Sequence, residues 1–64
     1  MNFRVVPKFV DVNSLQIWFV PQSNADARVI AQILMPADNQ LSDNVEAANE
    51  ICAILKKRIR KSVN

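Results

Sequence analysis

The most restrictive feature of this sequence is that its 64 residues lack the groups needed for an internal disulfide or an ordinary zinc site. Cys52 is the single cysteine and there is no histidine, so an internal disulfide is excluded and an ordinary zinc site is not expected. Domains shorter than about 70–80 residues rarely obtain more than about 3–5 kcal/mol from one hydrophobic core. We therefore expect a single small domain over residues 1–64 that gains stability by associating with a second molecule.

Composition indicates a folded, cytoplasmic protein. The apolar fraction of 50% is too high for a disordered chain, and no apolar run approaches the roughly 18 residues of a membrane span. Residues 1–4 lack the layout of a secretory signal. With one cysteine, the cytoplasm is the expected compartment, without membrane association.

Two N-terminal segments have the character of β-strands. Residues 2–10 alternate along an extended chain, and Pro7 within them lacks an N–H, which places this strand at a sheet edge. Residues 15–20, LQIWFV, are dense in aromatic and β-branched side chains and stop at Pro21. The turn between them contains Asn13, which could adopt the positive φ that glycine would otherwise supply.

A third segment, residues 27–35, is open to two interpretations. Arg28 and Gln32 lie four apart, as on a helix face, and Ser23 with Asp26 could cap a helix. Three β-branched residues and the closing Pro36 favour a strand over residues 28–35.

The C-terminal third predicts a helix over residues 43–61. Asp43 and Glu46 form a capping box, and no proline or glycine follows them. The predicted fold class is therefore α+β: a three-stranded antiparallel sheet followed by one C-terminal helix packed on one face. At about 100° per residue, one apolar stripe should face the sheet. It comprises Val45, Ala48, Cys52, Leu55 and Ile59, with Ile51 at its border.

The missing residue types argue against catalysis. Without glycine there can be no Walker-A loop or dinucleotide fingerprint, and without histidine the usual general base is absent. Glu46 and Glu50, one helical turn apart, are interpreted as part of a solvated face, and Cys52 as a small buried hydrophobe. We expect no catalytic residue, metal, cofactor or small-molecule substrate.

The predicted sheet carries more apolar surface than one helix can cover. Trp18 would anchor a protein-binding site on the opposite face, with a second copy of the chain, a host protein, or both as partners. Two other interpretations remain: an ordinary exposed sheet face, or an RNA base stacked on Trp18. The predicted protein-binding residues are Trp18, Val20, Ile30, Leu34, Arg4 and Arg28, and Val6, Val10, Lys8, Gln16 and Gln32 are expected on the same face.

Charge is concentrated at the C-terminus. Residues 1–55 hold all six acids and three of the eight bases. Bases in the last turns of a helix interact favourably with its dipole, and here they spread over roughly 200°, as expected of a solvated helix end. Nucleic-acid binding by this end is the alternative function. The residues concerned are Lys56, Lys57, Arg58, Arg60 and Lys61.

The order of the segments resembles a known group of proteins. The stretches LQIWFV, ARVIAQIL and VEAANEICAILKK are similar in layout to small accessory proteins of bacteriophages and other mobile elements, in which short strands precede one Ala-rich helix. The resemblance implies a cytoplasmic protein that acts by stoichiometric binding and inhibits or redirects a host factor.

Overall fold

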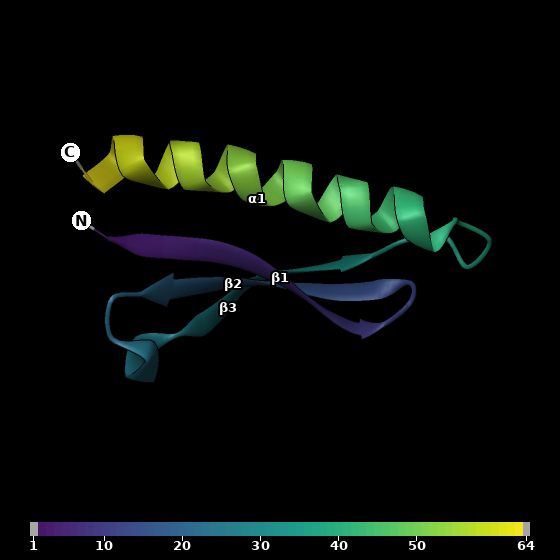
Figure 1. Cartoon of the computed structure of the whole chain (residues 1–64), viewed down its shortest axis with the longest axis horizontal. Coiled ribbons are helices and arrows are strands. Elements are labelled where there is room, and N and C mark those ends of the chain that lie inside the picture. The colour runs from purple at the N-terminus through teal and green to yellow at the C-terminus, as the bar shows by residue number, and fades with distance from the viewer. Residues whose placement is uncertain (1, 64) are drawn as a thin grey trace.

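The computed structural model describes the backbone of residues 2–63 and the side chains of residues 2–59. Strands β1 (Phe3–Asp11), β2 (Ser14–Pro21) and β3 (Arg28–Leu34) form one antiparallel sheet in the order β1-β2-β3. A 3-10 turn, η1 (Asn24–Asp26), joins β2 to β3, and helix α1 (Leu41–Val63) follows the sheet (Figure 1). The α+β prediction is confirmed, with the first strand at an edge and the ambiguous third segment a strand.

Helix α1 packs on one face of the sheet, mainly along β1 and to a lesser extent β2. Figure 1 shows the helix along one side of the twisted sheet, beside the first part of β1, with the strands crossing near the middle of the view. Side chains from β1, β2 and α1 therefore supply the core. Its buried apolar members are Phe3, Val5, Leu15, Ile17, Ala48 and Cys52, and Phe9, Phe19, Ala31, Ile33, Met35, Ile51, Leu55 and Ile59 pack around them.

The helix begins two residues earlier than predicted, and its buried stripe starts with a polar residue. Its first hydrogen bond runs from the N–H of Asn44 to the carbonyl of Gln40, so Asp43 lies inside the first turn and cannot be the N-cap of the predicted capping box. The predicted burial of Val45 is also wrong, because this side chain is 42% exposed whereas Asn44 is fully buried.

Hydrogen bonds explain why Asn44 takes the buried position. Its Nδ2 donates to the carbonyl of Val12 at 2.8 Å, and its Oδ1 accepts from Nδ2 of Asn39. The side-chain amide thus ties the start of α1 to the β1–β2 turn. A pattern based on apolar residues alone misses such a position, because its burial depends on partners that are distant in sequence.

The β1–β2 turn is built without a positive φ, so that prediction for Asn13 is wrong: no residue in the described chain has one. Instead, the N–H of Asn13 donates to Oδ1 of Asp11 at 2.9 Å, and the pairing register shifts between Phe9 and Asp11. The Asn13 side chain donates to the carbonyl of Pro36 at 3.0 Å, which links the turn to the segment after β3.

A bulge in β3 changes which side chains share a face. Ile17 pairs with Ala31, but the next residue, Trp18, pairs with Val29, so Ile30 is an extra residue in β3. In a bulge, two residues of one strand oppose one residue of the other. Val29 and Ile30 therefore both oppose Trp18.

The bulge overturns the predicted placement of Arg28. Arg28 pairs with Phe19, and its guanidinium carbon lies 5.3 Å from the centre of the Phe19 ring. It therefore shares the face of Phe19, on the helix side of the sheet, and not the face of Trp18. Val29, which pairs with Trp18, lies on the face opposite the helix.

Candidate protein-binding face

The sheet surface opposite α1 forms a continuous face, called here the open face. Cross-strand pairs Arg4 with Val20 and Val6 with Trp18 set its register on β1 and β2, and the β3 bulge adds its own residues. In the described part of the chain, no helix packs on this face. Its members are Arg4, Val6, Lys8, Asp11, Ser14, Gln16, Trp18, Val20, Val29, Ile30, Gln32 and Leu34.

Trp18 is held in a defined position at the centre of the open face. Its Nε1 donates a hydrogen bond to Oε1 of Gln16 at 3.1 Å, and Nζ of Lys8 lies 5.6 Å from its ring centre. The indole is half-buried by these neighbours and not by the helix. A large aromatic side chain whose orientation is fixed before binding loses little entropy in a complex, which favours its use as an anchor.

Exposed aliphatic side chains extend from Trp18 across β3. Val29 and Ile30 are more than one third exposed, and Leu34 at the end of the strand is 81% exposed. Single exposed apolar residues are normal, but these three lie on one strand beside a tryptophan. The open face therefore has an aromatic centre with an aliphatic extension, which is the composition of a protein interface.

The cations of the open face, Arg4 and Lys8, both lie on β1, whereas the β2 and β3 parts are apolar or carry hydroxyl and amide groups. Asp11, at the turn end of β1, shares this face through its pairing with Ser14, and its carboxylate accepts a hydrogen bond from the N–H of Asn13. A partner would therefore place apolar side chains over β2 and β3, and acidic or neutral groups beside β1.

Most of the predicted protein-binding residues lie together on the open face. Trp18, Val20, Ile30, Leu34 and Arg4 share the open face, and Arg28 does not. Lys8 and Gln16, also expected on this face, are the residues that contact the indole. The two-residue alternation of the strands places both on the same side of the sheet as Trp18.

The basic helix end is only partly described. Lys56, Lys57 and Arg58 are exposed on α1, while the side chains of Arg60 and Lys61 lie outside the described residues. These three bases follow the last carboxylate of the chain, Glu50.

The residues weighed as possible catalytic groups lie either in the core or on the exposed side of α1. Cys52 is buried in the core, and this burial raises the pKa of its thiol, which disfavours the reactive thiolate. Asp43, Glu46 and Glu50 border a shallow recess on the exposed side of α1. Among the described residues, no three potential metal ligands are grouped, and no helix has the length and apolar character needed to cross a membrane.

Comparison with known proteins finds no relative of this chain. No protein-family model, curated protein or solved structure matches this chain.

Proposed function

We propose that this chain is a non-enzymatic, cytoplasmic protein-binding module whose open face occludes a surface of its partner. The observation that carries this proposal is the position of Trp18, fixed by Gln16 and Lys8 at the centre of an uncovered apolar face. Hydrogen-bonded, preoriented aromatic side chains are the groups most often responsible for affinity at protein interfaces.

The amount of exposed surface supports the proposal. The chain exposes 4750 Å² for a mass of 7.2 kDa, whereas a compact monomer of this mass is expected to expose about 4100 Å². This excess reflects a flat, elongated shape of 39 × 23 × 14 Å in which one face of the sheet is left uncovered. Burying about 200 Å² of apolar surface contributes roughly 5 kcal/mol before the costs of association, which is comparable with the stability of so small a domain.

The first partner to test is a second copy of the chain. In a two-fold dimer the same patch meets itself, so the β1 rows carrying Arg4 and Lys8 would repel each other if they were superposed. We therefore expect β2 and β3 of one protomer to pack over β2 and β3 of the other, with the cations at the rim. A host protein that binds the same face, as the resemblance to phage accessory proteins implies, would compete with this dimer.

Replacing Ile30 by lysine is expected to weaken self-association about 30-fold or more, because it places a charge within the apolar contact. Sedimentation equilibrium across a concentration series provides the measurement. Ile54→Lys is the matched control, since Ile54 is another exposed isoleucine but lies on α1. Equal dissociation constants for the two variants, or a wild-type chain that stays monomeric and captures no partner through this face, would refute the proposed function.

Nucleic-acid binding by the basic end of α1 is the second candidate. Lys56, Lys57 and Arg58 are all exposed, and helix formation alone does not require every one of them. If the bases contact phosphates, affinity for a short oligonucleotide falls by a factor of about ten or more between 50 and 200 mM salt. Neutralising the five bases with glutamine removes this dependence. A weak, salt-independent interaction in the wild-type chain would eliminate the candidate.

A further inference from the structure

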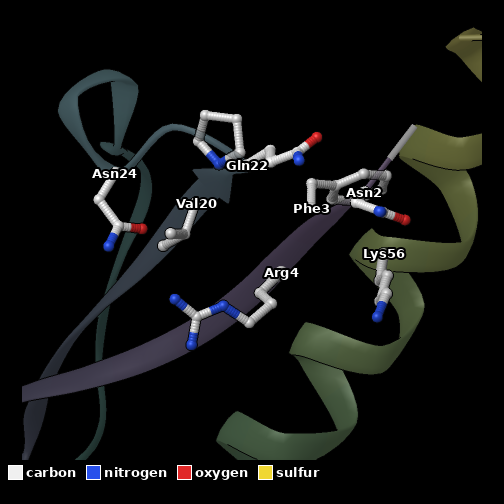
Figure 2. Close-up of a pocket in the computed structure, with 8 residues that line it drawn as sticks. Asn2, Phe3, Arg4, Val20, Gln22, Asn24 and Lys56 are labelled. Carbon is white, nitrogen blue, oxygen red and sulfur yellow. The ribbon is translucent and has the colours of Figure 1, made fainter.

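A depression of about 420 Å³ lies at the end of the molecule where the start of β1, the end of β2 and the C-terminal half of α1 meet (Figure 2). Its volume falls within the roughly 300–1,000 Å³ typical of small-molecule sites. Elements distant in sequence build it, so it exists only in the folded chain. The lining residues are Asn2, Phe3, Arg4, Val20, Pro21, Gln22, Asn24 and Lys56.

The polar lining of this depression is suited to an anion. Arg4 and Lys56 contribute two cations, Asn2, Gln22 and Asn24 contribute side-chain amides, and no carboxylate borders it. Neither cation is in an ion pair with another described side chain, although the chain contains six acids. Guanidinium, ammonium and amide groups are all hydrogen-bond donors, and the charged ones bind phosphate oxygens most strongly.

The two cations approach the depression from different sides. In Figure 2 the guanidinium of Arg4 lies toward Val20 and Asn24, whereas the ammonium of Lys56 lies on the helix side with Asn2. A single compact anion would engage one of them at a time. An elongated ligand with two linked anionic groups would engage both.

We propose that this depression binds a small ligand carrying two linked phosphate groups, such as pyrophosphate or the diphosphate of a nucleotide. Arg4 binds one phosphate and Lys56 the other, while the amides donate to remaining oxygens. Phe3, Val20 and Pro21 provide the apolar part of the lining, against which an organic substituent could rest. A nucleic-acid strand is less well suited, because the neighbouring bases Lys57 and Arg58 do not border the depression.

The test is a titration with inorganic pyrophosphate and, separately, with orthophosphate, at constant ionic strength maintained with sodium chloride and followed by amide chemical shifts. Pyrophosphate is expected to bind about tenfold more tightly than orthophosphate, since it can reach both cations. Arg4→Gln and Lys56→Gln should each weaken pyrophosphate binding about tenfold and bring it to the level of orthophosphate. Lys57→Gln, which removes the adjacent charge, should leave it unchanged, and circular dichroism should confirm that all three variants fold.

Three results would overturn this proposal. They are equal affinities for the two anions, an equal loss in Lys57→Gln, or much tighter binding of a short single-stranded oligonucleotide with losses spread over all the basic residues. The depression shares Arg4 and Val20 with the open face, but residues outside this overlap allow the two proposals to be tested separately. Ile30→Lys should retain pyrophosphate binding, and Lys56→Gln should retain self-association, so that either proposal can fail while the other stands.

Discussion

Replacing Ile17 by alanine is expected to leave the domain largely unfolded at 25 °C. Ile17 is 0% exposed and lies in the central strand, beneath α1. Truncating a buried isoleucine to alanine costs about 2–5 kcal/mol, because it removes apolar burial and leaves a cavity. A domain of this size has about 3–5 kcal/mol in total, so the variant loses most or all of its stability. Urea denaturation followed by far-ultraviolet circular dichroism measures the change.

Ile54→Ala provides the matched control for this experiment. The same atoms are deleted, but Ile54 is 58% exposed on α1, so we expect a change within about 0.5 kcal/mol. Because association stabilises the folded chain, both variants must be compared with the wild type at one protein concentration. Similar losses in the two variants would mean that the core is not organised around β2.

Asn44→Ala is expected to destabilise the domain by about 1–3 kcal/mol, the second largest effect. The substitution leaves the Val12 carbonyl and the Asn39 amide without the partner that each has in the structure. It also removes the link between the start of α1 and the β1–β2 turn. Loss of this link should be visible as faster amide hydrogen exchange at both places, in addition to a lower urea midpoint.

Asn49→Ala controls for the asparagine substitution itself. Asn49 lies on the same helix but is exposed, and alanine is the better helix former, so this variant should be unchanged or slightly more stable. If Asn44→Ala were as stable as Asn49→Ala, the buried amide would not be holding the helix to the sheet.

The sequence predicts most elements of this fold because their signals are local, whereas the segment that forms β3 is open to two interpretations. The apolar composition of β2, the proline in β1 and the uninterrupted helical segment each act over a few residues. Asn44 could not be predicted in this way. Helical periodicity locates a buried stripe to within one position, and the choice between Asn44 and Val45 depends on hydrogen bonds to Val12 and Asn39 that only the folded chain brings together.

The candidate site, too, could be predicted from the sequence only in part. Strand alternation correctly placed Arg4, Val20 and Leu34 with Trp18, because a two-residue repeat is regular until something interrupts it. The bulge at Ile30 is such an interruption, and one extra residue moves every preceding side chain of β3 to the other face. Arg28 was therefore assigned to the wrong face. No glycine marks the bulge, so the sequence contains no local sign of it.

The most direct test of the proposed binding face is a comparison of backbone amide chemical shifts in dilute and concentrated solutions of the wild-type chain. We expect concentration-dependent shifts along β2 and β3, centred on Trp18 and Ile30, with little change around Ile54 on α1. Shifts centred on the exposed side of α1, or spectra that do not change with concentration in a chain that also captures no partner through Trp18, would contradict it.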